Sequence, residues 1–490
     1  MCYNENGGNR MKKNNLWKAI GICFLAYVVL SWMIPTGYFT NGALVKSTTE
    51  PLGFFDIIRY PIVTASTSLF ALTAIVVLLI GGFYSVLNQT GAYANVVNQV
   101  SEKFKENGHI FLAITIFVFA LLSSLTALTL PLFVMVPFFV AVILKLGYNK
   151  VVALLSTVGA ILVGNMGSTY GFNVNGYLTY FFGTGINDTI VTRILFFLVV
   201  TNVLIGFVLF LSEKQKLDST KGKKSTKKEA AAIEIPLYEN HVDKKKSAAP
   251  MVIISIFMVV LILVGMYNWE IGLRVEFFNN IHTSITGFEI AGYPIFANMI
   301  GSVDPLGYWS NYELAVVLFL ATMLIAWIYD VKGQEKWQSF LAGMKAMVPV
   351  AIYTVAASIL FLLMNSSNTG ATFFHTIANF LLQLTKGKFN VFSFGFLSAI
   401  GGVFYHDFPY LVNAIYDPVI TLYTNYGFIG MLMQMLHGLV MLIAPTSVIL
   451  VAGLKYLDIS YTEWFKNIWK YLLLALLVIV IFIVLLLLLG

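Results

Sequence analysis

Three features of the 490-residue chain predict an all-α polytopic membrane protein. Hydrophobic residues make up 58% of the sequence and charged residues only 11%, which is not the composition of a soluble protein. Several apolar runs reach the roughly 20 residues that a helix needs to cross a bilayer. Two runs are interrupted by polar stretches, and non-helical backbone is tolerated at membrane depth only where it is buried in protein or lines a wet cavity.

The predicted spans follow one another along the chain. The first, residues 16–34, is too long for the core of a signal peptide and has no small-residue cleavage site, so we expect it to remain as a helix. Seven further apolar runs are predicted to enter or cross the membrane, at residues 61–87, 109–122, 190–211, 250–267, 313–329, 347–364 and 468–489.

Four remaining stretches depart from the pattern of a simple span. Residues 123–146 and 391–419 are apolar but interrupted by hydroxyl side chains and prolines, which favours re-entrant hairpins. Residues 151–182 hold a run from 164 to 176 with three asparagines, four glycines and a Ser-Thr pair, where a helix is expected. This run, and the Ala-Pro-Thr-Ser sequence within residues 428–456, predict two broken helices.

Charged residues divide the chain into halves and orient it. Residues 213–249 hold ten lysines against six acidic residues, and residues 268–311 hold one arginine against four acidic residues. Under the positive-inside rule the first segment is a flexible cytoplasmic linker between halves 1–212 and 250–490, and the second is an external loop. The basic N-terminus is also placed inside. The lysine run is equally what a solvated segment without a partner shows, and we do not interpret it as a nucleic-acid site.

An internal repeat relates the two halves. Several short matches recur 278 to 281 residues later, among them Thr-Gly-Ala at 90–92 and at 369–371, and this nearly constant offset holds over about 80 residues. The charge pattern makes span 61–87 run inward and span 347–364 run outward. The matching spans therefore point in opposite directions. This is the inverted-topology repeat of secondary transporters, which bind their solute near the midplane.

Other functional classes lack their signatures. The sequence has no GxSxG, HExxH or phosphate-binding lysine motif, and its two cysteines, Cys2 and Cys23, cannot form a metal site. An intramembrane enzyme would need a nucleophile–base pair, and a channel would need a continuous polar stripe rather than two isolated breaks. We expect no cofactor, and we expect Na⁺ or a proton as the coupling ion if transport is ion-coupled.

The two breaks carry the candidate binding groups. The N-terminus of a half-helix carries about half a positive charge and free amide donors, which can hold a carboxylate without an arginine. Side chains that offer oxygens to Na⁺ or to an amine occur in both breaks: Asn165, Ser168, Thr169, Asn173, Thr446 and Ser447. Alternatively, these residues have a structural role, because Gly-Ser-Thr runs also permit close helix packing.

Three ionisable residues in apolar surroundings are further candidates. Asp407 lies in the second hairpin, and an acidic side chain at membrane depth is a functional hypothesis by default, as a ligand of an amine, Na⁺ or a proton. Alternatively, Asp407 lies at a hairpin tip that reaches the water surface. His406 can titrate near neutral pH or be a packed interfacial residue. His437, in the middle of a span, has either a coupling role or the role of a satisfied core histidine.

At five stretches the chain resembles the YfcC-like branch of the DcuC (C4-dicarboxylate anaerobic carrier) family, in the ion transporter superfamily. The matching stretches are Ile-Pro-Thr-Gly-Tyr at 34–38, residues 81–92, residues 159–173, Ala-Pro-Thr-Ser at 444–447 and Tyr-Thr-Glu-Trp at 461–464. The resemblance covers most of the chain, apart from the segments 213–249 and 268–311.

This resemblance implies an elevator-type carrier with a scaffold, a transport domain holding the two hairpins, and often a homodimer. It places ligands at the hairpin tips and helix breaks: Ser123, Ser124, Thr126, Asn165, Ser168, Thr169, Asn173, His406, Asp407, Pro445, Thr446 and Ser447. The chain departs from the family at both tips. Residues 126–130 lack the paired glutamates of many members, and residues 404–409 replace a small-residue tip with Phe-Tyr-His-Asp-Phe-Pro.

The sequence thus predicts a secondary transporter in the plasma membrane, an exchanger or an ion-coupled symporter, for a small carboxylate-bearing metabolite. The family name implies a C4-dicarboxylate. Such a solute would favour a buried cation, whereas Arg193 and Lys345 are expected at span ends. Asp407 instead suits the side-chain amine or guanidinium of ornithine or arginine, which relatives of this branch exchange. We therefore favour an amino acid, with a C4-dicarboxylate as the alternative.

Overall fold

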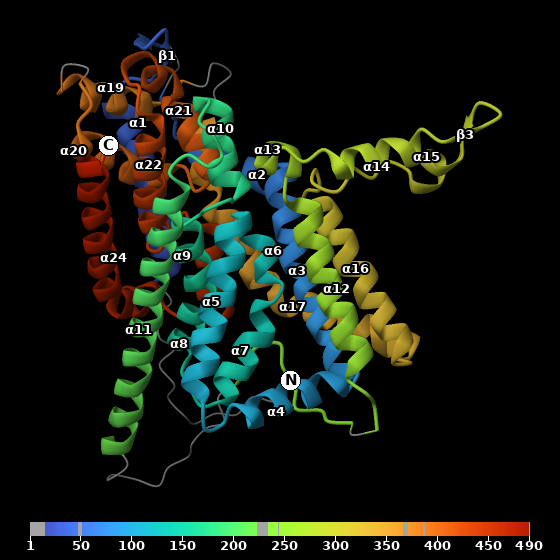
Figure 1. Cartoon of the computed structure of the whole chain (residues 1–490). Coiled ribbons are helices and arrows are strands. Elements are labelled where there is room, and N and C mark those ends of the chain that lie inside the picture. Colours follow the sequence, from blue (N-terminus) through green and yellow to red (C-terminus); the bar gives the residue numbers. More distant parts are fainter. Residues whose placement is uncertain are drawn as a thin grey trace.

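The computed structural model describes residues 15–47, 51–222, 234–243, 245–365, 371–385 and 388–489, and structural statements here refer to these residues. It is a bundle of helices (Figure 1). Eight helices in the described part are long and apolar enough to cross a membrane: α1 (Leu16–Met33), α3 (Ser68–Gln89), α5 (Gly108–Thr126), α11 (Ile190–Gly222), α12 (Ala249–Met266), α16 (Asn311–Ile328), α17 (Gly333–Ala357) with its continuation α18 (Ile359–Asn365), and α24 (Tyr461–Leu489). The predicted polytopic helical fold is confirmed.

Shorter helices lie between these spans. In the first half they are α2 (Asp56–Ser66), α4 (Ala92–Lys103), α6 (Leu130–Phe133), α7 (Val136–Lys145), α8 (Lys150–Leu154), the π-helical turn η1 (Leu155–Gly159), α9 (Ala160–Met166), the π-helical turn η2 (Phe172–Gly176) and α10 (Tyr177–Phe182). In the second half they are α19 (Phe373–Gln383), α20 (Val391–Phe404), α21 (Phe408–Leu422), α22 (Tyr426–Met441) and α23 (Val448–Tyr456). None of these alone reaches the length of a full span.

Small strands occur only on connecting segments of the described chain. Strand β1 (Gly37–Thr40) pairs with β2 (Ala43–Lys46) through a two-residue turn, Asn41-Gly42, in which both residues have positive φ. The predicted external loop 268–311 is an arm that extends sideways from the bundle (Figure 1). It contains α13 (Trp269–Leu273), α14 (Phe277–Thr286), β3 (Glu289–Ile290), β4 (Tyr293–Pro294) and α15 (Ile295–Ile300).

The first hairpin differs from its predicted bounds. The sequence places both limbs within 123–146, but the structure has α5 as the first limb and α6 with α7 as the second. The chain reverses at Ala127, whose φ of 53° is left-handed. The hydroxyl residues that suggested an earlier break remain helical because they find carbonyl partners; the hydroxyl of Thr126, for example, donates to the carbonyl of Leu122 at 2.7 Å.

The second hairpin consists of α20 and α21, with its turn at 405–407. Its open end lies beside the β1–β2 strands, where the backbone N–H of Gly42 donates to the carboxylate of Asp417 at 2.7 Å. The open end of the first hairpin lies beside α4, where the ammonium of Lys145 donates to Asn98. Because α4 and β1 are at opposite ends of the bundle (Figure 1), the open ends of the two hairpins also lie at opposite ends.

Each hairpin is followed by a helix that breaks. Segments α8, η1 and α9 form one continuous helix, which ends at Met166 and resumes as η2 and α10. In the second half α22 ends at Met441, and α23 begins at Val448 after the Ala-Pro-Thr-Ser sequence. The interruptions thus lie at 167–171 and 442–447, within the segments 151–182 and 428–456.

The predicted span 61–87 is in fact two helices, α2 and α3. They separate at Thr67, whose backbone is extended (φ −71°, ψ 128°) and whose hydroxyl donates to the carbonyl of Val63 at 2.8 Å. Thr67 stands between Ser66 and Ser68, and this polar interruption within the apolar run was not interpreted as a helix end. Helices α17 and α18 separate at Ser358, but there the backbone stays in the right-handed helical region (φ −85°, ψ −7°).

Helices α3, α12, α16 and α17 pack together as one group, which we call the scaffold (Figure 1). Within it α3 and α17 cross at Gly81 and Gly343. A Cβ atom on Gly81 would lie 2.2 Å from the carbonyl oxygen of Gly343, and a Cβ atom on Gly343 would lie 2.1 Å from that of Gly81. No side chain fits at either position, so these two glycines set the spacing of the scaffold pair.

Part of the predicted flexible linker is docked onto the bundle, which corrects that expectation. Helix α11 continues to Gly222, and residues 234–243 lie across α3 and α4. The amide of Asn88 donates to the carbonyl of Leu237 and its oxygen accepts from the N–H of Glu239, each at 3.1 Å. The lysine-rich residues 223–233 are outside the described part of the chain.

Substituting Gly81 by alanine is expected to separate α3 from α17, because the new methyl group would overlap a backbone carbonyl. We expect a loss of unfolding free energy on the order of 1–3 kcal/mol, typical of overpacked sites. The midpoint of thermal unfolding in detergent measures it. Gly206→Ala in α11 is the matched control, because no atom lies within 4 Å of its added Cβ. Equal midpoints for the two variants would contradict this role for Gly81.

Candidate functional site

A polar cavity of about 240 Å³, which we call the central cavity, lies where the two hairpin turns approach the scaffold. The first turn contributes residues 127–131 and the second contributes residues 406–408. The first broken helix adds Asn165 and Asn173, and the start of α23 adds Val448. The scaffold side is formed by the start of α3 and by the junction of α17 with α18. Elements that are distant in sequence thus enclose one volume.

The second turn presents the ionisable side chains of this cavity. Asp407 occupies the position before α21 with an extended backbone, and Pro409 follows in the first turn of the helix, where its missing N–H has no effect. The turn is fixed from behind by His437, whose Nε2 donates to the carbonyl oxygen of Tyr405 at 2.9 Å. Asp407 is therefore held at the cavity wall rather than at a water-exposed tip.

Asp407 and His406 both have unused hydrogen-bonding capacity. Within the described residues, the carboxylate of Asp407 forms no hydrogen bond or salt bridge, although part of it faces the cavity. Nδ1 of His406 is buried without a partner, and its ring lies 4.7 Å from that of Phe361. These are the only two ionisable side chains of the described lining, so the cavity has one potential negative charge and no permanent positive one.

The first break contributes two amide side chains to the cavity. The oxygen Oδ1 of Asn165 is buried and has no hydrogen-bond partner in the described structure. Asn173 lines the same space. A buried acceptor without a donor is uncommon, and it points to a ligand or an ion that supplies the missing partner. Asn175, by contrast, is used structurally, because its amide donates to the carbonyls of Thr169 and Ile186.

Four of the predicted binding residues, Ser123, Ser124, Ser168 and Thr169, instead form hydrogen bonds that hold the first break against α5. The hydroxyl of Ser124 donates to the carbonyl of Gly167 at 2.8 Å and lies 3.1 Å from the hydroxyl of Thr169. Ser168 donates back to the carbonyl of Ser124, and Ser123 donates to that of Ile161. All four side chains are buried and do not line the central cavity. Their polar atoms join α5 to the break.

Three further predicted residues lie at the second break, whereas Thr126 is at the end of α5 and does not line the central cavity. The hydroxyl of Thr446 donates to the carbonyl of Val403 at 2.7 Å, which joins the break to α20. Ser447 is buried at the start of α23, next to the cavity residue Val448. Pro445 lines a separate cavity of about 760 Å³, which Lys18 also borders. Of the twelve predicted ligands, the structure therefore brings Asn165, Asn173, His406 and Asp407 together around the central cavity.

Sequence reasoning missed a buried polar pair behind the first break. Arg193 lies at a span end as expected, in the first turn of α11, but its side chain is only 3% exposed, which corrects the expectation that the chain offers no buried cation. It donates to the side-chain oxygen of Gln434 on α22, whose amide donates to the carbonyls of Met166 (3.0 Å) and Ser168 (2.9 Å). Gln434 thus satisfies carbonyls that the break leaves free. No motif in the sequence marks this residue.

Three further cavity residues were also missed: Thr129, Ser358 and Asn311. Thr129 had a signal, because a threonine two residues before Pro131 is typical of a helix start. Ser358 had no such signal because it lies inside the predicted apolar span 347–364. Asn311 had none because it lies at the boundary between the predicted loop 268–311 and the next span. Their contribution depends on tertiary contacts between the halves.

The arrangement can hold a solute that carries both signs of charge. The N-termini of α21 and α23 begin at the cavity, and their free amides can donate to a carboxylate. The carboxylate of Asp407 and the oxygen of Asn165 can accept from an ammonium group or bind Na⁺. In the part of the chain that the structure describes, no group of three His, Cys, Asp or Glu side chains could hold a metal ion.

Replacing Gln434 by methionine keeps the volume but removes the donors to Met166 and Ser168 and the acceptor of Arg193. Each buried polar group left without a partner costs about 1–3 kcal/mol, so we expect the unfolding midpoint to fall clearly. Gln383→Met, on the exposed surface of α19, is the control. A midpoint unchanged from that control would show that the pair does not support the break.

The chain was compared with protein families, curated proteins and solved structures. A family model described as the C4-dicarboxylate anaerobic carrier, DcuC, matches residues 16–404 and 421–488. No match is found among curated proteins. Among solved structures, the YdaH transporter of Alcanivorax borkumensis is similar at 12% identity over 96% of this chain and 97% of that chain, with a TM-score of 0.37. Because the family model covers most of the sequence, the chain belongs to the C4-dicarboxylate anaerobic carrier family, a family of multi-pass membrane transporters rather than enzymes.

Proposed function

We propose that the protein is a secondary transporter that binds a small carboxylate-bearing solute in the central cavity. The observation that carries this proposal is the convergence of both hairpin turns and the first helix break on one polar volume, with Asp407 and Asn165 left without partners in the described structure. Membership of a carrier family supports it. The site lies between the hairpins and the scaffold, where movement of one against the other would expose it to either side.

An amino acid is the solute that the charges favour. A dianion would bring two negative charges close to Asp407, and two like charges 4 Å apart repel by about 4 kcal/mol at an effective dielectric constant of 20. The described lining offers no cation to offset this repulsion. A zwitterionic or basic amino acid, such as arginine or ornithine, would place its ammonium or guanidinium group at Asp407 and its carboxylate at the helix N-termini.

A C4-dicarboxylate is the second candidate, and the description of the matching family favours it. In this case Asp407 would have to be neutralised when the solute binds, by a proton or by Na⁺. The unpartnered oxygen of Asn165 beside the cavity suits Na⁺, which binds oxygen ligands. The two candidates therefore differ in a testable way: the dicarboxylate requires a coupling cation for binding, whereas a basic amino acid does not.

The proposed transport mechanism is an elevator movement of two inverted repeats. The placement of the hairpins' open ends at opposite ends of the bundle and the two helix breaks support the repeat, and the glycine-packed scaffold supports a rigid body against which the hairpins move. We also propose a plasma-membrane location with the N-terminus and residues 213–249 in the cytoplasm, as the lysine distribution favours, and a homodimer, by analogy with elevator carriers. Size measurement in detergent tests the dimer.

Two measurements test the function. A thermal-shift screen of the purified protein across amino acids and dicarboxylates, with and without Na⁺, identifies the solute class. Counterflow in proteoliposomes then tests the mechanism, because internal solute accelerates uptake by a carrier but not by a channel. Stabilisation only by succinate or fumarate would reject the amino-acid assignment, and uptake without counterflow would reject a carrier.

Asp407→Asn is expected to weaken binding of a basic amino acid about 10- to 100-fold, because a charge-assisted hydrogen bond contributes roughly 1.5–3 kcal/mol. Isothermal titration of the detergent-solubilised protein measures the affinity. Asp417→Asn is the matched control on the same helix, since its side chain bonds Gly42 away from the cavity and asparagine can still accept from that N–H. Equal affinities in both variants would remove Asp407 from the site.

Asn165→Ala is expected to lower solute affinity, whereas Ser124→Ala is expected to lower stability. The oxygen of Asn165 has no partner in the described structure, so its loss should leave the unfolding midpoint nearly unchanged while solute affinity falls about tenfold, as expected for the loss of one strong hydrogen bond. Ser124 holds the first break against α5, so its loss should lower the midpoint. The assignment of Asn165 to the binding site would be wrong if its variant kept the full affinity.

A further inference from the structure

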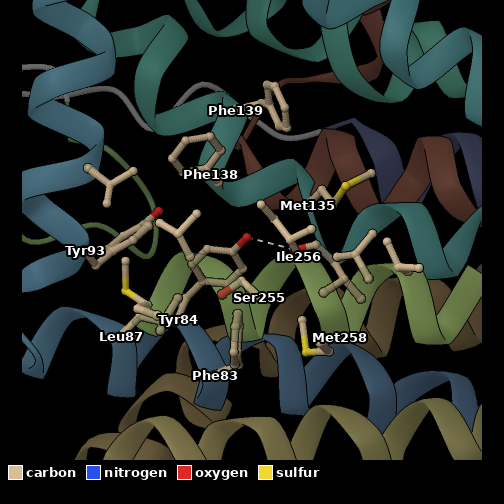
Figure 2. A pocket seen from close by; sticks show the side chains of 16 residues that line it. Phe83, Tyr84, Leu87, Tyr93, Met135, Phe138, Phe139, Ser255, Ile256 and Met258 are labelled. Carbon is tan, nitrogen blue, oxygen red and sulfur yellow. Dashed lines mark hydrogen bonds between the residues drawn. The ribbon is translucent and has the colours of Figure 1, made fainter. Parts of the chain in front are cut away.

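A second cavity of about 380 Å³ lies between the scaffold and the first hairpin (Figure 2). Its walls are α3, the start of α4, residues 251–260 of α12, the segment that joins α6 to α7, and the start of α7. We call it the lateral groove. Its lining is apolar except for the hydroxyl groups of Tyr84, Tyr93 and Ser255. Such a space suits neither a charged solute nor a metal ion.

The lateral groove opens toward the lipid-facing surface. Ile256 and Val260, on its rim, are 59% and 50% exposed on a helix that crosses the membrane. The lining of α12 runs from Met251 to Val260, which corresponds to about 14 Å at 1.5 Å per residue. This is half of the roughly 30 Å thickness of the hydrocarbon core. The groove therefore extends over the depth of one lipid leaflet.

One buried hydroxyl group in the groove lacks a partner among the described residues. The hydroxyl of Tyr84 donates to the carbonyl of Val134 at 2.8 Å, but that of Tyr93 forms no hydrogen bond to any described residue, although its side chain is only 2% exposed. Figure 2 shows the Tyr93 hydroxyl on the side of its ring that faces Tyr84. A buried donor of this kind requires an acceptor. Tyr93 lies in α4, which runs across the end of the bundle, where lipid ester groups are found (Figure 1).

We propose that the lateral groove binds one acyl chain of a phospholipid from the leaflet on the α4 side, and that Tyr93 donates a hydrogen bond to an ester carbonyl of that lipid. The apolar walls bury the chain from its ester end at Tyr93 toward Val134 and Met135. The lipid ester supplies the acceptor that the protein does not.

This site is directly behind the central cavity. Leu130 and Pro131 line the central cavity, whereas Val134 and Met135, one helical turn further along, line the lateral groove. The tip of the first hairpin therefore lies between the two spaces. The coupling of lipid to solute rests on the proposed function. If the hairpin moves during transport, a bound lipid stabilises one of its positions. Lipid and solute then change each other's affinity by the same factor.

Native mass spectrometry of the full chain tests the site with dioleoyl phosphatidylglycerol and its diether analogue, which lacks the ester carbonyls. Ser255→Trp is expected to fill the groove. Leu320→Trp in α16 is the control, because Leu320 is 58% exposed. We expect Ser255→Trp to retain one lipid fewer than both the wild type and Leu320→Trp. Equal lipid counts in both variants would overturn the proposal.

Tyr93→Phe is a second test that does not change the packing. The wild type is expected to bind the diester lipid about fivefold or more tightly than the diether, and Tyr93→Phe should bind both equally; Tyr180→Phe, on the surface, should retain the preference. An unchanged preference in Tyr93→Phe would reject the ester contact. These counts are made without solute, so a failure of solute binding leaves them valid, and a failure of lipid binding leaves the transport proposal intact.

Discussion

Backbone groups inside a bilayer must find partners within the protein, and the architecture of this carrier depends on that constraint. Each break in a helix releases carbonyls and amides that lipid cannot satisfy. Here they are satisfied by a small set of side chains: Ser124 and Gln434 at the first break, Tyr461 and Trp464 at the second, and His437 behind the second hairpin turn. Because these residues are used structurally, the few polar groups left unpaired at the central cavity are informative.

The two buried charges near the breaks have different environments. Arg193 is enclosed by Gln434, Thr189 and a backbone carbonyl, and it forms no salt bridge within the described residues. Asp407 faces a cavity and has no donor among the described residues that line it. A cation satisfied by neutral oxygens can remain in place throughout transport, whereas a carboxylate without donors requires a partner from outside. This contrast is why we propose Asp407, rather than Arg193, as the group that meets the solute.

The sequence predicted most of the membrane-spanning helices and the two interrupted segments, because each depends on local hydropathy and on Gly, Pro and hydroxyl residues. Span 61–87 is two helices instead, and the re-entrant course of the hairpins stays a prediction. Sequence reasoning misplaced the first hairpin because hydroxyl residues at the end of α5 bond carbonyls and do not end the helix. It could not separate ligands from residues that hold the break: Ser168 and Asn165 are three positions apart, and only tertiary contacts show that one is bonded and the other free. Gln434 and Ser358 were missed for the same reason.

The central claim is that a solute binds between the two hairpin turns. The most direct test is a cryo-electron microscopy map of the protein with its most stabilising solute. The account predicts solute density in the central cavity, within hydrogen-bonding distance of the Asp407 carboxylate and the Asn165 amide. Density in the separate cavity beside Lys18 and Pro445, with the central cavity closed or occupied only by water, would contradict it.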